Sequence, residues 1–134
     1  MTLATADRVQ IRVSDDVVRV RQAVRARAIA MGFGLVDQTK FVTAASELAR
    51  NTLDYGGGGE MTIEVVQKAS RPGLRLSFSD KGPGIADIEQ ALTDGFTSGH
   101  GLGLGLSGAR RLSSEFEIES VVGEGTRVSI VRWK

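Results

Sequence analysis

The stretch Leu74-Arg-Leu-Ser-Phe-Ser-Asp-Lys-Gly-Pro-Gly84 is an alternating segment that ends in an aspartate and a glycine-rich loop. Leu74, Leu76 and Phe78 alternate with polar residues, which is the period of a strand with one buried face. Asp80 has the same parity as these apolar residues, so we expect its carboxylate to point towards the core side. Such a carboxylate needs a partner, because burying an unpaired charge is costly.

Two interpretations of Asp80 are open. Its carboxylate could accept backbone N–H groups from the following turn, as turn aspartates commonly do. Alternatively, Gly82 and Gly84 remove side chains on both sides of Pro83, so that a flat ligand could approach the backbone and donate an exocyclic amine to Asp80. An adenine base meets that requirement.

Helices and strands are expected on both sides of this segment. Residues 9–13 alternate as a strand, and Ser14 can cap a helix that continues to Met31. Asp37 can cap a second helix that ends near Tyr55. The inward stripe of that second helix is expected to contain Phe41, Ala44, Ala45, Leu48 and Thr52.

Glycine and proline mark the later boundaries. Gly56 to Gly59 are expected to form a flexible turn, and Arg71-Pro-Gly73 a hairpin turn. The remaining expected elements are a strand at 61–65, helices at 87–93 and 106–116, and a closing hairpin of strands 117–122 and 126–133. This order predicts an α+β fold, a two-layer sandwich with a mainly antiparallel mixed sheet covered by helices on one face.

The composition limits the function classes. A chain of 134 residues fits a single domain, 1–134, and its 41% hydrophobic and 25% charged residues are typical of a globular protein. A net charge of +1 gives no reason to expect nucleic acid or an anionic membrane as partner. The chain has no cysteine, and we find no signal peptide or membrane-spanning segment. We therefore expect a cytoplasmic protein.

The first helix carries a row of arginines at positions 19, 21, 25 and 27. They could bind a partner or a phosphate, but a solvated helix face is the simpler interpretation. We assign this row no role in a site.

Glu47 and Asn51 are four residues apart and share one face of the second helix. Alone, the pair could be an exposed glutamate and an asparagine near a helix end. Beside a nucleotide, an amide oxygen can bind Mg²⁺ while a carboxylate activates a hydroxyl.

A glycine run, Gly99-His-Gly-Leu-Gly-Leu-Gly105, leads directly into an expected helix. Its backbone N–H groups could converge on phosphate oxygens, although such a loop could also be only a mobile linker. His100 could contact a phosphate or be incidental. The run matches neither the P-loop nor the dinucleotide fingerprint.

Taken in order, these segments resemble the Bergerat-fold (GHKL) ATPases, which include gyrase, Hsp90, histidine kinases and MutL. Glu47 to Asn51 matches the N box of the family, Asp80 to Gly84 the first glycine box, Gly101 to Gly105 the second, and Gly125-Thr126 the last. Within the superfamily the chain is most similar to the anti-sigma regulatory serine/threonine kinases of the RsbT switch type.

That similarity extends over almost the whole chain. It is carried by residues 34–38, 44–51, 94–98, 101–106 and 118–126. Lys81 stands where relatives often have a polar amide or an acid, and Ser107 where RsbT-type chains tend to have proline. These departures bear on partner choice more than on ATP binding.

The resemblance implies transfer of the ATP γ-phosphoryl group to a serine or threonine of a STAS-domain antagonist, in a bacterial stress-signalling partner switch. Asp80 and Thr126 would bind adenine, Asn51 would bind Mg²⁺, and Glu47 would be the general base. The remaining nucleotide-binding positions implied are Gly82, Gly84, Gly99, His100, Gly101, Leu102, Gly103, Leu104 and Gly105. We expect the glycine run to act as a lid.

The resemblance also implies a PP2C-type phosphatase and an alternative sigma factor as partners. Two other functions stay open: an anti-sigma factor that sequesters a sigma subunit, and a non-catalytic interaction module gated by ATP. The intact Glu47 argues against the second.

Overall fold

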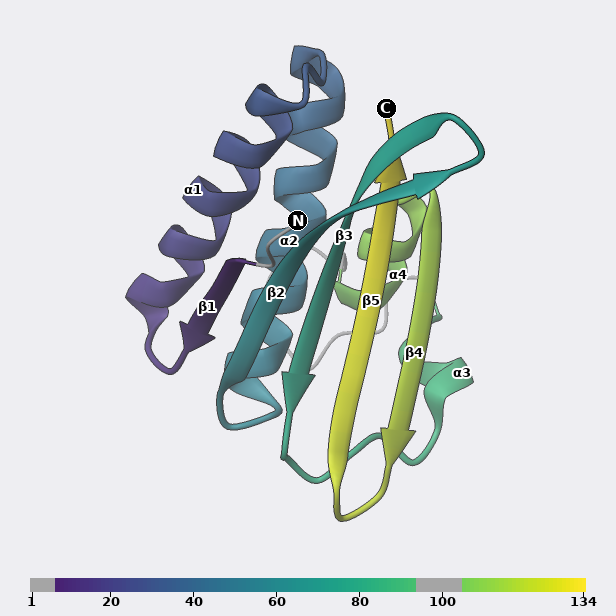
Figure 1. Cartoon of the computed structure of the whole chain (residues 1–134). Helices are drawn as coiled ribbons and strands as arrows, with labels where there is room; N and C mark the ends of the chain where they lie inside the picture. The colour runs from purple at the N-terminus through teal and green to yellow at the C-terminus, as the bar shows by residue number, and fades with distance from the viewer. Residues whose placement is uncertain (1–6, 94–104) are drawn as a thin grey trace.

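The computed structural model describes residues 7–93 and 105–134, which form one antiparallel sheet with helices on one face (Figure 1). The elements follow the order β1 (Asp7–Ile11), α1 (Ser14–Ala30), α2 (Leu35–Asp54), β2 (Gly59–Lys68), β3 (Arg71–Asp80), α3 (Ile88–Ala91), α4 (Gly105–Arg111), β4 (Glu115–Val121) and β5 (Gly125–Trp133). None of these described helices is both long and apolar enough to cross a membrane.

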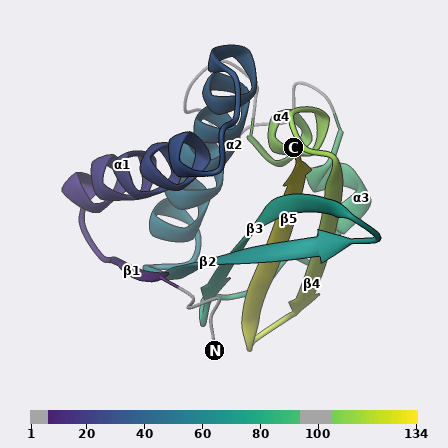
Figure 2. The ribbon, with the colours of Figure 1, turned by 45° about the horizontal axis from the view of Figure 1, so that its top comes forward.

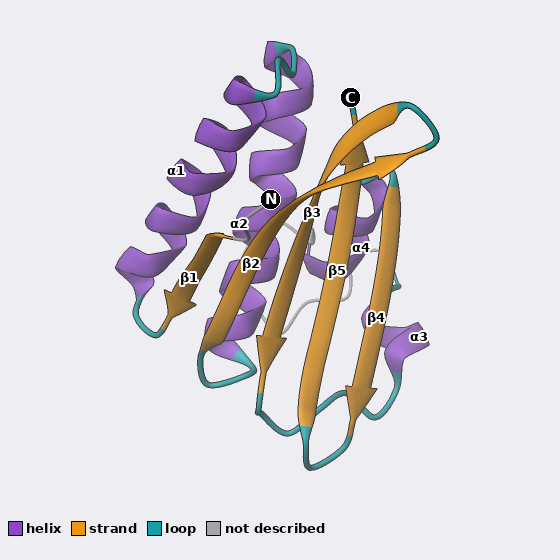
Figure 3. Cartoon of the chain, viewed as in Figure 1, coloured by secondary structure: helices purple, strands orange, loops and turns teal. Residues whose placement is uncertain are grey.

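The sheet has the strand order β1-β2-β3-β5-β4 (Figure 3). All four pairings within the described ranges are antiparallel, so no parallel pair of a mixed sheet occurs there. β3 lies in the middle, and its last residue, Asp80, is paired with Gly59 of β2 and Thr126 of β5. The α+β two-layer fold expected from the sequence is confirmed.

The core fills the space between the sheet and the helix layer, which Figure 2 shows from a second angle. α2 lies against both α1 and the sheet, and all five residues of its expected inward stripe are buried. They meet the alternating apolar residues of the central strands, Met61, Ile63, Leu74, Leu76 and Phe78. This packing is what anchors α2, and with it Glu47 and Asn51, beside the end of β3.

The hairpin between β2 and β3 turns two residues earlier than the sequence suggested. Arg71, Pro72 and Gly73 belong to β3 and pair with residues of β2, while Ala69 in the turn adopts a positive φ of 55°. Gly73 is required by packing, because a Cβ there would lie 2.6 Å from the Trp133 ring. The prediction of a turn at Arg71–Gly73 was therefore wrong.

Several helix boundaries also differ from expectation. The N-cap of α1 is Val13 and not Ser14, and α3 spans Ile88–Ala91 where a helix was expected at 87–93. α2 begins at Leu35 with Gly34 as its N-cap, so Asp37 lies in the first turn instead of capping it. α4 ends at Arg111, and Phe116 belongs to β4, where it pairs with Ile130. At Phe116, pairing with β5 is favoured over continuation of α4.

Candidate nucleotide-binding site

A cavity of about 290 Å³ opens beside α2, at the ends of β3 and β5 and at the start of α4. Five separate segments of the chain contribute to its wall, because Ala91 of α3 also lines it. Of the residues predicted from the sequence, it is lined by Glu47, Asn51, Asp80, Gly84, Gly105 and Thr126. The fold thus brings the predicted segments to one place, while the role of each residue stays a prediction.

The two carboxylate oxygens of Asp80 have different surroundings. Oδ1 accepts the backbone N–H groups of Gly82 at 2.9 Å and of Thr126 at 3.3 Å. Oδ2 has no hydrogen-bond partner within residues 7–93 and 105–134. Both interpretations of Asp80 therefore have a counterpart, since one oxygen serves the turn and the other can accept a hydrogen bond from a ligand.

The glycines of the loop after β3 allow close contact within the protein. A Cβ on Gly82 would lie 2.7 Å from Cα of Gly56, and one on Gly84 would lie 2.4 Å from the carbonyl oxygen of Val121. Gly84 also has a positive φ of 79°, which disfavours other residues. Gly82 does not line the cavity. These glycines seat the loop against Gly56, which follows α2, and against β4, while their role in admitting a ligand stays a prediction.

Gly56 was not singled out by sequence analysis, which assigned it to a flexible turn. A Cβ at this position would lie 2.4 Å from Cγ and 2.5 Å from Oδ2 of Asp80. The only sequence signal was a glycine directly after the helix end. Its contact with Asp80 depends on how α2 packs on β3.

The side-chain hydroxyl of Thr126 makes no hydrogen bond to Asp80. Its Oγ1 lies 2.8 Å from Oγ of Ser120, which also accepts the N–H of Ile85 at 2.7 Å. The contact from Thr126 to Asp80 is made by the backbone N–H. Ser120 was missed by the sequence analysis, and it connects β4, β5 and the loop after β3.

Glu47 and Asn51 lie one turn apart on α2, both half-buried and both facing the cavity. Oε1 of Glu47 accepts the backbone N–H of Gly105 at 3.2 Å. The side-chain amide of Asn51 has no hydrogen-bond partner in the described part of the chain. Glu47 is thus oriented by the start of α4, and Asn51 is available to a ligand.

A metal ion here would have few protein ligands. No group of three His, Cys, Asp or Glu side chains in the described ranges could hold one. Mg²⁺ suits such a site, because it commonly keeps waters and phosphate oxygens and takes one or two ligands from the protein.

Six predicted positions, Gly99, His100, Gly101, Leu102, Gly103 and Leu104, lie outside the described residues. Gly105, the last of the glycine run, is the first residue of α4.

The apolar part of the wall was largely absent from the sequence-based prediction. It consists of Leu48, Tyr55, Phe78, Pro83, Ile85, Ala91, Leu106 and Val128. Apolar walls with a few polar groups are typical of small-molecule sites, and a flat base is well matched to them. Strand parity points to Phe78 and Val128, two residues from Asp80 and Thr126, whereas the others converge only through tertiary packing.

Comparison with known proteins gives a consistent group of relatives. Residues 36–134 match the family model described as histidine kinase-, DNA gyrase B-, and HSP90-like ATPase. The chain is 46% identical over 125 residues to serine/threonine-protein kinase RsbT of Bacillus subtilis (strain 168), covering 93% of this chain and 94% of that one.

More distant relatives carry a different name. The chain is 31% identical over 96 residues to the anti-sigma F factor of Thermoanaerobacter sp. (strain X514), covering 68% of this chain and 66% of the relative. A solved structure, the mycobacterial sensor histidine kinase MprB, has a TM-score of 0.48 and 18% identity, over 96% of this chain and 97% of that chain.

Proposed function

The chain belongs to the histidine kinase-, DNA gyrase B- and HSP90-like ATPases and is an ATP-dependent serine/threonine kinase of the RsbT type, and we propose that its substrate is a STAS-domain antagonist protein. The 46% identity to RsbT over nearly the full length of both chains carries the assignment of activity. The substrate class is our proposal.

We propose that Asp80 selects adenine. The observation in favour is that Asp80 lines a cavity with apolar walls while its Oδ2 has no hydrogen-bond partner among the described residues, so this oxygen can accept a hydrogen bond from the exocyclic amine. Thr126 supports this carboxylate through its backbone N–H, and Ser120 supports Thr126. Asp80 would then hold one end of the nucleotide while its phosphates extend towards α2 and α4.

We propose that Asn51 contributes the protein ligand to Mg²⁺. Its amide oxygen is the kind of neutral oxygen donor that Mg²⁺ accepts, and the amide faces the cavity. The ion would neutralise charge on the phosphates, which is a large part of what phosphoryl transfer requires. We also propose that the backbone N–H groups of residues 99–105 donate hydrogen bonds to the phosphate oxygens.

We propose that Glu47 is the general base. One of its oxygens accepts a hydrogen bond from Gly105, and Oε2 has no partner within the described ranges. Glu47 would take the proton of the acceptor hydroxyl as that oxygen bonds to the γ-phosphorus and ADP leaves. A carboxylate on a helix whose inner face packs in the core meets the positioning requirement of such a step.

The test of this function is incubation of the protein with labelled ATP, Mg²⁺ and candidate STAS proteins, followed by mapping of the modified residue. We expect label on one serine or threonine of a STAS protein and labelling at least about a hundredfold slower with a Glu47→Gln variant. If the protein binds ATP but labels no candidate, the non-catalytic module gated by ATP becomes the better description.

A second candidate function is supported by the relatives named anti-sigma F factor. In that case the chain would also bind a sigma subunit and sequester it. Binding assays against sigma factors and STAS proteins in parallel, with ATP and with ADP, separate the two functions. A PP2C-type phosphatase is a third kind of partner that the same assay can examine.

A further inference from the structure

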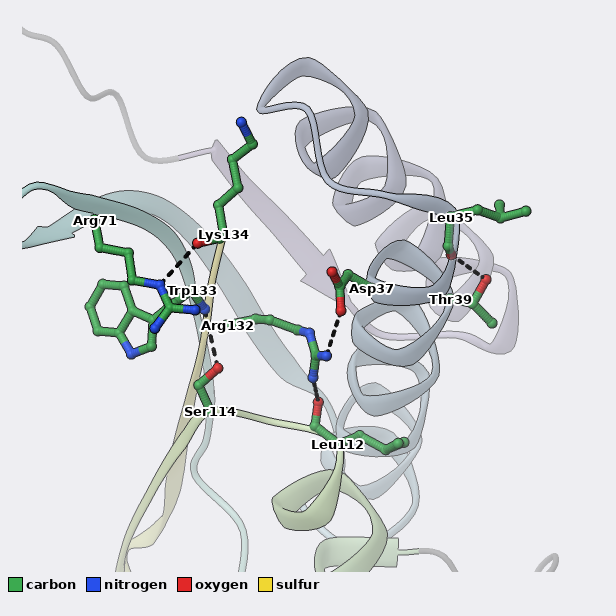
Figure 4. Close-up of polar contacts among 9 residues, drawn as sticks. All are labelled: Leu35, Asp37, Thr39, Arg71, Leu112, Ser114, Arg132, Trp133 and Lys134. Carbon is green, nitrogen blue, oxygen red and sulfur yellow. Dashed lines mark hydrogen bonds and ion pairs between the residues drawn. The ribbon is translucent and has the colours of Figure 1, made fainter.

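Arg132 joins two helices through one guanidinium group (Figure 4). It lies in β5, where its Nη1 donates to the carbonyl oxygen of Leu112 at 2.8 Å and its Nη2 donates to Oδ1 of Asp37 at 2.6 Å. The side chain of Arg132 is only 17% exposed. The side chain of Asp37 is 49% exposed, so water screens the pair at its carboxylate end, while the guanidinium is largely shielded.

Both acceptors lie at helix ends where such a contact is favourable. Leu112 directly follows α4, so its carbonyl oxygen is at the negative end of that helix and lacks an intrahelical donor. Asp37 lies in the first turn of α2, where a negative charge is favoured. Arg132 thus ties the end of α4 to the start of α2.

A second contact joins the start of α4 to the C-terminal half of α2. Gly105, the first residue of α4, donates its N–H to Glu47 at 3.2 Å. At about 1.5 Å per residue, Glu47 lies about 15 Å along α2 from Asp37, and Gly105 about 10 Å along α4 from Leu112. Besides the packing of Leu106 and Ala109 in the core, α4 is therefore held by a hydrogen bond inside the cavity, at its start, and by one well outside the cavity, at its end.

We propose that Arg132 is a positioning residue for phosphoryl transfer, which holds α4 so that Gly105 orients the carboxylate of Glu47. This inference rests on the proposed function, in which Glu47 is the base. The adenine end is expected to be independent, because Thr126 lies about 20 Å from Arg132 along β5 at about 3.4 Å per residue. Loss of Arg132 should affect transfer far more than ATP binding.

The primary test is Arg132→Met, which keeps an apolar stem and removes the guanidinium. We expect the transfer rate constant per ATP-bound protein to fall between about tenfold and a hundredfold, the range expected for a misplacement of about 1 Å. The Kd for ATP should change less than about threefold, which is less than about 0.7 kcal/mol. In the nucleotide-free protein, hydrogen exchange should become faster at the amides of α4.

Arg27→Met is the matched control. Arg27 is also mostly buried, with a side chain that is 25% exposed, and it pairs with Asp7 at 2.7 Å, but it joins α1 to β1. This variant should lose thermal stability while keeping the transfer rate constant per bound ATP and the exchange rates of α4. A purely structural role of Arg132 predicts the same behaviour for Arg132→Met, and that result would overturn the proposal.

Two milder variants keep the test decisive if Arg132→Met does not fold. Asp37→Asn keeps the contact with Leu112 and should lower the transfer rate constant less. Arg132→Lys keeps the charge, so its transfer rate constant should lie between those of the wild type and of a variant without the charge. It should not reach the wild-type value, because lysine lacks the planar fork that reaches both acceptors. Unchanged rate constants and unchanged α4 exchange in both would reject the role of Arg132.

Hydrogen exchange also separates this inference from the proposed function. If the wild-type protein labels no acceptor, the kinase substrate is wrong, yet faster α4 exchange in Arg132→Met would still support the link from Arg132 to Gly105. If the wild type labels a STAS protein and α4 exchange does not respond, the positioning role alone fails.

Discussion

Gly56 and Asp80 are in direct contact, since a Cβ on Gly56 would lie 2.4 Å from Cγ of the aspartate. We expect Gly56→Ala to displace the Asp80 carboxylate and to lower the affinity for ATP by at least about tenfold, which is about 1.4 kcal/mol. Gly34→Ala is the control, because no atom lies within 4 Å of a Cβ there. Equal ATP affinity in both variants, measured by calorimetry, would contradict the role given to Gly56.

Asp80→Asn tests the adenine assignment at a single atom. The amide can still accept the N–H groups of Gly82 and Thr126 through its oxygen, but its NH₂ group then faces the exocyclic amine of adenine. Because donor would meet donor, we expect ATP binding to weaken by at least about a hundredfold with the fold retained. Near-normal affinity in the variant would remove Asp80 from adenine recognition.

Glu47→Gln separates orientation from base function. The amide oxygen of the variant can still accept the N–H of Gly105, so the start of α4 should stay in place. We expect ATP to bind normally while transfer falls by about a hundredfold or more, the usual contribution of a general base. A variant that transfers phosphoryl at the wild-type rate would show that Glu47 is not the base.

Asn51→Ala tests the proposed metal ligand. With Mg²⁺ present, we expect the affinity for ATP to fall by about tenfold, or about 1.4 kcal/mol. With the metal removed by a chelator, variant and wild type should bind ATP equally, because the lost interaction is the one with the ion. A deficit that persists without Mg²⁺ would assign Asn51 to direct contact with the nucleotide.

Asp16 gives the fold a defined response to acid. Hydrogen bonds from the backbone N–H groups of Arg12 and Val13, at 2.8 and 3.1 Å, and then the guanidinium of Arg19, hold the pKa of its carboxyl below the ordinary 3.8, although burial acts in the opposite direction. A lowered pKa stabilises the folded state above the unfolded-state value, and this contribution disappears as the pH falls through the folded-state value.

Asp16→Asn should therefore melt at a lower temperature than the wild type by a constant margin above about pH 5. The margin should shrink below pH 3.8, as the wild-type carboxylate takes up its proton. Asp15→Asn is the control, since Asp15 is an exposed neighbour in the same turn. A margin that does not change with pH would show that the charge of Asp16 does not stabilise α1.

Some features of the site follow from local periodicity and were predicted for that reason. The alternation in β3 places Asp80 beside the core, and the spacing of Glu47 and Asn51 places both on one face of α2. A strand has a period of two residues and a helix one of 3.6, so side-chain direction follows from position along the element. The order of the four family segments could also be read directly from the chain.

Other boundaries could not be predicted locally, because distant contacts override turn signals. Pro72 and Gly73 look like a turn, yet they belong to a strand because Gly73 packs under Trp133. Phe116 continues a helical pattern, yet it pairs with Ile130 in the sheet. In both cases partners far along the chain decide the local structure.

The sequence by itself determined the fold class, the order of the four family segments and the parity of Asp80, because each depends on residues that are close along the chain. Only the tertiary structure decided the contacts of Gly56 with Asp80, Ser120 with Thr126, and Arg132 with Asp37. The last of these joins residues 95 positions apart. Such contacts depend on strand register and helix packing, which are set by the burial of the whole core at once.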